Sequence, residues 1–124
     1  MAERVLNALP VEETRLRAAR GDDITLGIAV ADDSGAAIDL TDCILRYTAR
    51  MNAEDEDAVI EVEVDTHTDA ADGESEIPLS ASDLDLDAGE YAHDLELEDA
   101  GGKIRTLFRG TLEIVQDVTR YVAP

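Results

Sequence analysis

The chain has 124 residues, and its 30 acidic side chains against 10 basic ones give a formal net charge of −20. This length fits one domain with a core of its own, and the single cysteine, Cys43, excludes a disulfide-built secreted scaffold. So acidic a chain is not expected to bind nucleic acid or an anionic membrane. No stretch approaches the roughly eighteen apolar residues of a membrane span, and residues 1–10 lack the apolar run of a signal peptide.

The placement of the acids favours a folded sheet over a disordered chain. An acidic composition with only 3% aromatic residues is close to that of disordered segments. Here, however, acids alternate with apolar residues, as at Glu61, Glu63 and Asp65, which is typical of the solvent face of strands. Lys103 is the single lysine, and aspartate outnumbers glutamate. We interpret the acidic excess as adaptation to high salt, because a Debye length of only ~3 Å at about 1 M screens the repulsion.

Residues 1–20 are predicted to form an N-terminal arm. Residues 2–9 favour one or two helical turns that end before Pro10. The run 14–20 (TRLRAAR), together with Arg4, is the basic part of the chain, and two interpretations of it stay open. It is an edge segment whose arginines pair with the domain's own acids, or an arm that lies on the acidic surface of a neighbouring subunit. The candidate partner-binding residues are therefore Arg4, Arg15, Arg17 and Arg20.

From residue 21 onward, period-two patterning predicts about seven short strands and no long helix. Turn chemistry is expected at 32–35 and 69–74, and an irregular or helical turn at 80–87 with Ser82 as its N-cap. Pro78 favours an edge position. The predicted strands cover 24–30, 36–40, 43–51, 59–66, 77–79, 91–98 and 104–114.

The last two of these strands form a long hairpin around which the chain is organised. Ile104, Phe108, Leu112 and Ile114 share one parity and are expected on the apolar face. Gly110 marks a bulge or a close backbone approach. The tight turn between them is expected at residues 100–102, where the pair Gly101-Gly102 offers the positive φ angles of a two-residue hairpin turn.

The segment 86–91 resembles the tyrosine corner of immunoglobulin-like sandwiches, in which a tyrosine hydroxyl bonds to backbone a few residues upstream. We therefore predict an all-β, immunoglobulin-like antiparallel sandwich over residues 21–120, with the arm at 1–20 and a tail at 121–124. The residues expected to define this fold are Gly89, Tyr91, Gly101, Gly102 and Gly110.

No motif for catalysis or ligand binding stands out. Asp83, Asp85 and Asp87 have the spacing that begins an EF-hand loop, but the glycine and the bidentate glutamate that should follow are absent. His93 is expected to be buried and hydrogen-bonded, and His67 exposed. Neither a nucleophile elbow nor a glycine-rich phosphate loop is present. We therefore expect no enzyme, no cofactor, no metal and no small-molecule substrate.

Several segments in order are similar to one family. They are 21–22, 33–41 (DSGAAIDLT), 77–84 (IPLSASDL), 89–91 (GEY), 94–97 (DLEL), 102–103 and 110–114 (GTLEI). Their order and spacing resemble the N-terminal immunoglobulin-like domain of the baseplate upper protein family of tailed phages, over about Gly21 to Arg120. With the acidic composition, this indicates a halophile-adapted version, as from a haloarchaeal virus.

The resemblance implies a non-enzymatic virion structural protein of the tail or baseplate. It implies assembly with copies of itself and with other virion proteins, and localisation in the virion after assembly in the host cytoplasm. Two alternatives stay open: a capsid decoration or turret protein, and a cellular surface adhesion domain.

Overall fold

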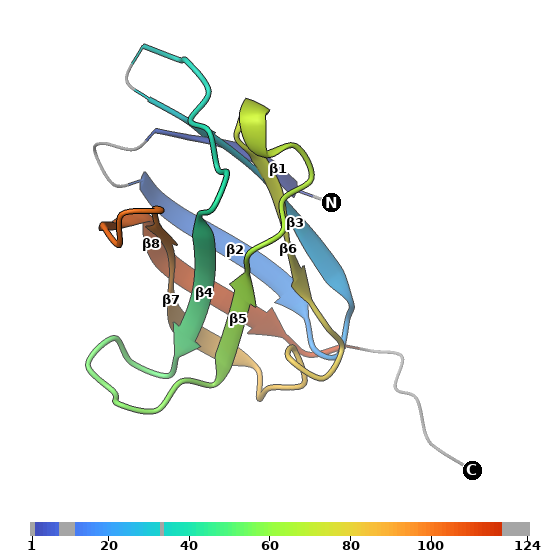
Figure 1. The fold of residues 1–124 in the computed structure, drawn as a ribbon. Coiled ribbons are helices and arrows are strands. Elements are labelled where there is room, and N and C mark those ends of the chain that lie inside the picture. The colour runs from blue at the N-terminus through green and yellow to red at the C-terminus, as the bar shows by residue number, and fades with distance from the viewer. Residues whose placement is uncertain (1, 8–11, 33, 118–124) are drawn as a thin grey trace.

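The long hairpin of β7 (Gly89–Glu98) and β8 (Ile104–Val115) lies at the centre of a five-stranded sheet (Figure 1). The computed structural model describes residues 2–7, 12–32 and 34–117, and their side chains from residue 13 onward. The sheet has the order β2-β8-β7-β4-β5, with β2 at Glu12–Ala19, β4 at Ile44–Arg50 and β5 at Ile60–Val64. Neighbouring strands in it are antiparallel except β2 and β8, which are parallel.

A second sheet of three strands completes the sandwich, in the order β1-β3-β6. Its strands are β1 (Ala2–Asn7), β3 (Ile24–Ala31) and β6 (Glu74–Leu79), and a single 3₁₀ turn, η1 (Ala70–Asp72), precedes β6. The prediction of an all-β, immunoglobulin-like sandwich is confirmed. The described residues form eight strands rather than about seven.

The core lies between the two sheets and follows the expected alternation. Along β6 and β7, inward residues are buried while their neighbours are exposed or half-buried. Burial of such apolar side chains is the main stabilising term for a sandwich of this size. The largest fully buried side chains are Tyr47, Phe108, Leu40, Leu45, Ile60, Ile77, Leu79, Leu84, Leu95, Leu107 and Leu112.

A β-bulge at Leu107 changes the phase of β8. Leu95 pairs with Phe108 whereas Glu96 pairs with Thr106, so Leu107 is the extra residue. Leu107 and Phe108 are both buried. In the part of β8 before the bulge, inward-facing and outward-facing positions are exchanged relative to the predicted alternation, and Ile104 is 55% exposed. The prediction that Ile104 lies on the apolar face is therefore wrong.

The N-terminal segment is extended, not helical. Residues 2–7 form β1, which pairs in parallel with β3, so the predicted helical turns are wrong there; residues 8–10 lie outside the described residues. A helix this short has little stability of its own, whereas the edge of β3 offers a ladder of backbone hydrogen bonds. Residues 12–19, also expected in an arm, form the edge strand β2. The first 20 residues thus give one strand to each sheet.

The turn between β7 and β8 has three residues, not two. The Asp99 amide donates to the Lys103 carbonyl at 2.9 Å, and the Asp99 carboxylate accepts from the amides of Gly101 and Lys103, both at 2.9 Å. Gly102 alone of the glycine pair has a positive φ, of 86°. This is the longer hairpin loop that places one glycine in the left-handed region. The turn lies at residues 100–102, as predicted, but the two-residue type is wrong.

Three further local predictions can be compared with the structure. Pro78 lies on β6, an edge strand, as predicted. Residues 36–40 do not form a strand, and their ladder contact is one bridge between Ala31 and Ala37. The turn after β6 is capped by Ser80 rather than Ser82, because Ser80 Oγ accepts from the Asp83 amide at 3.1 Å and Asp83 accepts from the Ser80 amide at 3.0 Å.

Candidate interaction surface

The arginines of β2 pair with acids of the same domain. Arg15 donates to Glu90 on β7 at 2.8 Å and to Glu113 on β8 at 2.9 Å. Arg17 lies 3.8 Å from Glu113. Side chains of three neighbouring strands therefore form one charged network on the outer face of the five-stranded sheet. The side chain of Arg4 lies outside the described residues.

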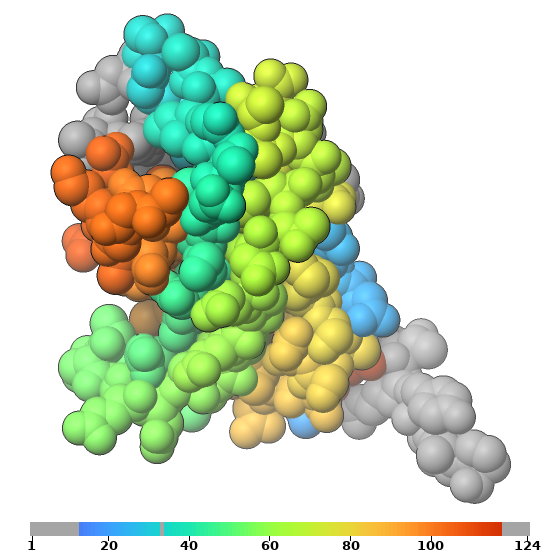
Figure 2. Space-filling view, viewed as in Figure 1, coloured from blue at the N-terminus to red at the C-terminus, as the bar shows by residue number. Residues whose placement is uncertain are grey.

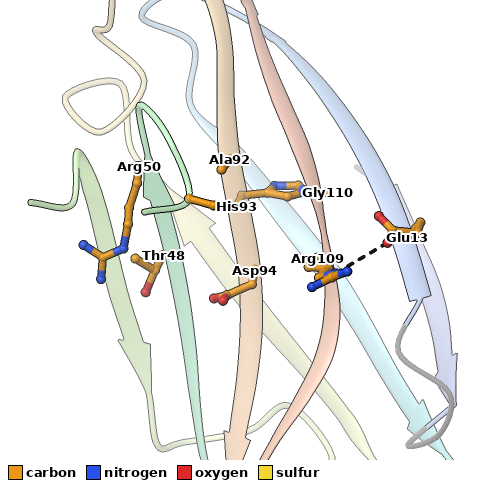
Figure 3. Close-up of a pocket in the computed structure, with 9 residues that line it drawn as sticks. Glu13, Thr48, Arg50, Ala92, His93, Asp94, Arg109 and Gly110 are labelled. Carbon is orange, nitrogen blue, oxygen red and sulfur yellow. Dashed lines mark hydrogen bonds and ion pairs between the residues drawn. The ribbon is translucent and has the colours of Figure 1, made fainter. Parts of the chain in front are cut away.

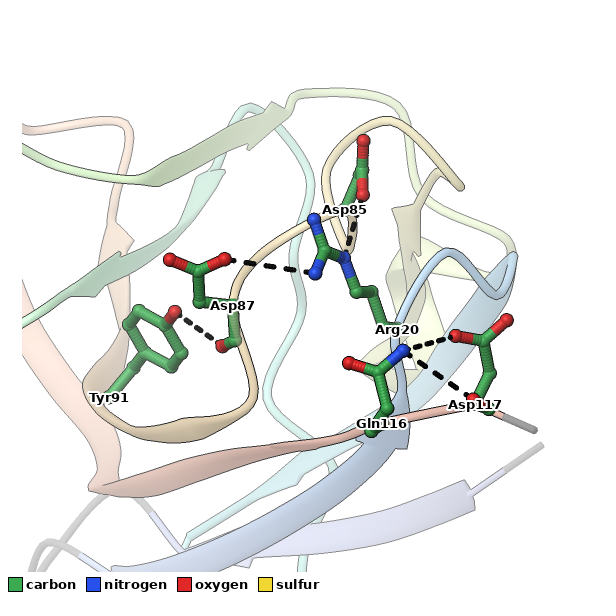
Figure 4. A network of polar contacts seen from close by, with 6 residues as sticks. All are labelled: Arg20, Asp85, Asp87, Tyr91, Gln116 and Asp117. Carbon is green, nitrogen blue, oxygen red and sulfur yellow. Dashed lines mark hydrogen bonds and ion pairs between the residues drawn. The ribbon is translucent and has the colours of Figure 1, made fainter. Parts of the chain in front are cut away.

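Arg20 and Tyr91 form a second polar network where β2 ends (Figure 4). Arg20 donates to Asp85 at 3.0 Å and lies 3.7 Å from Asp87. The Tyr91 hydroxyl donates to the Asp87 carbonyl at 2.6 Å, four residues upstream. The predicted tyrosine corner is therefore present. The side chains of Arg15, Arg17 and Arg20 lie as the first interpretation of the basic segment expects, and their binding to a partner stays a prediction.

Gly110 allows β2 to approach β8 closely. It lies opposite Thr14, and a Cβ built on Gly110 would stand 1.9 Å from the Thr14 carbonyl oxygen. The close approach predicted for Gly110 is confirmed, while the bulge of this strand lies at Leu107. Gly89 begins β7 and has no atom within 4 Å of a built Cβ.

Beneath this contact, His93 connects three strands inside the core. Its Nε2 lies 3.1 Å from the Thr14 carbonyl oxygen on β2, and its Nδ1 lies 2.8 Å from the Tyr47 hydroxyl on β4. A carbonyl oxygen only accepts, so Nε2 carries the proton and Nδ1 accepts from the tyrosine. His93 is buried, as predicted, and its ring lies 5.2 Å from that of Phe108.

Burial shifts both members of this hydrogen-bonded pair toward their neutral forms. Desolvation lowers the pKa of His93, and the bond to the Thr14 carbonyl opposes that shift. Desolvation, with a smaller contribution from the charge of Asp94, raises the pKa of Tyr47. The pair therefore acts as a neutral internal anchor for β2.

The prediction that His67 is exposed is wrong. It is half-buried, and its Nδ1 and Nε2 lie 2.8 Å from the Ser75 hydroxyl and the Cys43 carbonyl, respectively. His67 thus connects β6 of one sheet with Cys43, the residue just before β4 of the other. Cys43 is buried, as expected of a small apolar residue, and burial raises the pKa of its thiol.

The aspartates with EF-hand spacing do not converge on a common point. Asp83 accepts from the Ser80 amide, while Asp85 and Asp87 contact Arg20. Across residues 2–7, 12–32 and 34–117, no three His, Cys, Asp or Glu side chains lie where they could hold a metal ion. The same part of the chain contains no helix that is both long and apolar enough to cross a membrane.

A hollow of about 350 Å³ lies on the outer face of the five-stranded sheet (Figure 3). Three small residues, Ala53, Ala92 and Gly110, leave room between longer side chains. Figure 3 shows Asp94 on the central strand, with Thr48 and Arg50 on one side and Arg109 and Glu13 on the other. Sequence reasoning missed this site, because its residues come from four strands and one loop. The one signal in the sequence was Ala92, a small residue on the otherwise charged parity of β7.

The side chains around the hollow differ in how they are paired. Arg109 lies 3.5 Å from Glu13, and Arg50 donates to the Glu56 carbonyl at 2.6 Å. Among the side chains that the structure describes, none forms a hydrogen bond or ion pair with the Asp94 carboxylate. Burial, and then the neighbouring Glu96 charge, raise the pKa of Asp94, while Arg50 opposes that rise.

Neither a protein-family model nor a curated protein matches this sequence. Among solved structures, the chain is similar to the N-terminal domain of ORF48 of phage TP901-1, at a TM-score of 0.58 and 14% identity, covering 94% of this chain and 99% of that one. A looser likeness, at a TM-score of 0.43 and 16% identity, is to a chain in the structure of ICOS with ICOS-L and an anti-ICOS-L VNAR domain. It covers 85% of this chain and 56% of that chain.

Proposed function

We propose that this chain is a non-enzymatic structural domain of a tailed-virus particle, located in the tail or baseplate. The observation that carries the proposal is the likeness in fold to a phage protein domain along nearly its whole length. The ordered segments that resemble the baseplate upper protein family point to the same class. The charged networks and the buried anchors serve the stability of a sandwich, which suits a domain that contributes surface rather than chemistry.

The proposal extends to the partners and the environment of the domain. Its partners are other virion structural proteins and copies of itself, and it reaches the virion after assembly in the host cytoplasm. Its net charge of −20 suits a halophilic host, in which high salt screens a surface of this kind.

Immunogold labelling of intact virus particles tests the location. Antibodies against the purified domain are expected to label the tail or its tip, and serum absorbed with the same protein is the control. Gold confined to the head would overturn the tail assignment in favour of a decoration protein. Particles without label, both intact and after tail disruption, would overturn the virion assignment itself.

Light scattering in molar salt tests self-assembly, and thermal melting tests the salt requirement. A closed oligomer of fixed stoichiometry is expected, and a clean monomer would overturn self-association. Dialysis to low salt is expected to lower the melting temperature sharply, because unscreened acids repel one another. An unchanged melting temperature would remove the argument for a halophilic host.

A further inference from the structure

The outer face of the five-stranded sheet is crowded with charged side chains except at one place. Opposite signs face each other across neighbouring strands, as between Arg46 and Glu63 at 3.0 Å and between Arg46 and Glu98 at 2.7 Å. The hollow at Asp94 interrupts this pattern because Ala92 and Gly110, the residues beside it, have almost no side chain. A neighbouring surface can therefore insert a side chain here.

Within the hollow, Asp94 is the charged group that its neighbours leave unsatisfied. It lies opposite Arg109 in the strand register, yet the Arg109 guanidinium is turned toward Glu13. Arg50, on the other side, bonds to a backbone carbonyl of the 51–59 loop. A half-buried carboxylate without a partner gains more from an incoming cation than an exposed one, since it has already lost part of its hydration.

The chemistry of the occupant follows from the charges around it. Two acids, Asp94 and Glu13, and two arginines, Arg50 and Arg109, line the hollow, but Arg50 bonds to the Glu56 carbonyl and Arg109 pairs with Glu13. A carboxylate or phosphate would therefore meet the charge of Asp94 on a domain of net charge −20.

A second copy of the chain offers only 10 basic side chains, and Arg15, Arg20 and Arg46 among them are already paired with its own acids. A cationic side chain from a different protein meets neither obstacle. We propose that this hollow receives a lysine or arginine side chain from a neighbouring virion protein, an inference that rests on the function proposed above.

The surroundings of the hollow fit such an insertion. The loop at 51–59 and the turn at 99–103 project from the same side of the molecule and leave a recess between them (Figure 2). Ala53 of this loop lines the hollow. The volume of about 350 Å³ is at the lower end of the range for small-ligand sites, which suits a single side chain. The raised pKa of Asp94 agrees with this reading, because a bound cation would relieve the cost of its charge.

Nuclear magnetic resonance titration with capped amino acids tests the proposal on the whole chain. The probes are N-acetyl-arginine amide and N-acetyl-lysine amide, at constant ionic strength, with the neutral N-acetyl-glutamine amide as the reference. Saturable amide shifts are expected around Thr48, Ala92, Asp94 and Gly110, together with a fall in the pKa of Asp94. The neutral probe should produce neither effect.

Two variants that each remove one negative charge decide whether the site is specific. Asp94→Asn is expected to weaken binding of the cationic probes at least tenfold. Glu76→Gln, on an exposed position of the other sheet, should leave it unchanged. The site would be overturned if Asp94→Asn bound the cationic probes as tightly as the unchanged chain does. Amide shifts spread evenly over all acidic strands would overturn it too. Either result would leave the particle labelling untouched, whereas absence from the particle would overturn the proposed function and the identity of the partner.

Discussion

The two histidines of this domain make the same pair of hydrogen bonds in two different surroundings. In each, Nε2 lies within hydrogen-bonding distance of a backbone carbonyl, and Nδ1 lies within hydrogen-bonding distance of a hydroxyl. For His93 these partners are the Thr14 carbonyl and the Tyr47 hydroxyl. For His67 they are the Cys43 carbonyl and the Ser75 hydroxyl. His93 holds an edge strand from inside the core, whereas His67 is half-buried between the sheets. The difference teaches that bonding pattern alone does not set the value of an anchor. We expect access to water to set it, because His67 is half-buried and within reach of solvent whereas His93 is buried.

The largest effect is expected from the substitution Gly110→Ala, which breaks the contact above His93. The added Cβ would stand 1.9 Å from the Thr14 carbonyl oxygen, so β2 must move away and the bond from His93 is lost. We expect a loss of roughly 3 kcal/mol or more in the free energy of unfolding, measured by denaturant titration.

A matched control separates crowding from backbone strain. Gly89 has a φ of 152°, close to the 157° of Gly110, but a Cβ there meets nothing within 4 Å. Gly89→Ala should therefore cost much less than Gly110→Ala. Equal costs would show that backbone conformation, and not the approach of β2, explains both.

The substitution Tyr47→Phe removes the hydroxyl that bonds to Nδ1 of His93. The ring volume stays the same, so the loss measures a buried nitrogen without its partner. We expect a cost of about 1–3 kcal/mol in the free energy of unfolding. A change near zero would mean that a water molecule reaches His93 and that the two histidine sites are alike.

Acid is expected to weaken the His93 anchor in a defined pH window. Burial lowers the pKa of folded His93, so the unfolded chain, with an ordinary value near 6.5, binds the proton first. The contribution of His93 to the free energy of unfolding is therefore complete above about pH 6.5. As the pH drops toward the pKa of folded His93, this free energy falls by at most about 1.4 kcal/mol per pH unit. Denaturant titrations between pH 7 and pH 5 measure the slope.

The variant His93→Gln is the control for this pH dependence. The glutamine retains polar groups in the core but cannot titrate. The free energy of unfolding of this variant should therefore change less between pH 7 and pH 5 than that of the unchanged chain. Asp94 acts with the opposite sign, because its raised pKa adds stability at low pH that is lost as the pH rises. Identical slopes in the two proteins would contradict the assignment to His93.

The smallest effect is expected from Ser75→Ala at the half-buried histidine. The substitution removes the hydroxyl 2.8 Å from His67 Nδ1. Ser75 is itself buried, but the His67 ring is half-buried, and we expect solvent to reach the freed nitrogen from that side. We expect a cost of about 1 kcal/mol or less. A cost equal to that of Tyr47→Phe would contradict the idea that access to water distinguishes the sites.

The alternation of apolar and polar residues predicted the fold wherever it continued without interruption along a strand. Alternation located β4 and β7, and the spacing from Asp87 to Tyr91 was enough for the tyrosine corner. The bulge was not predictable, because Leu107 and Phe108 are consecutive apolar residues and either could face inward. The strand at 2–7 depends on the free edge of β3, a tertiary feature that short-range periodicity does not contain.

The candidate site was predictable only in part. The pairing of β2 arginines with the domain's own acids was one of two interpretations of their charge. The hollow requires Ala53, Ala92 and Gly110 to meet in space, although they lie far apart in the chain. The hydrogen bonds of His67 likewise depend on both sheets being in place. Such features follow from strand order, which the sequence pattern did not specify.

The parallel pairing of β2 with β8 has a consequence for synthesis. Leu16 lies opposite Leu112, so the edge strand and its partner are separated by almost the entire chain. Contacts of such long range fold slowly, because the loop must close before any of them forms. On the ribosome, β2 must wait, with its backbone unpaired, until β8 has left the exit tunnel. The sandwich therefore closes only after β8 has emerged, and a halt before Val115 would leave an exposed strand open to wrong partners.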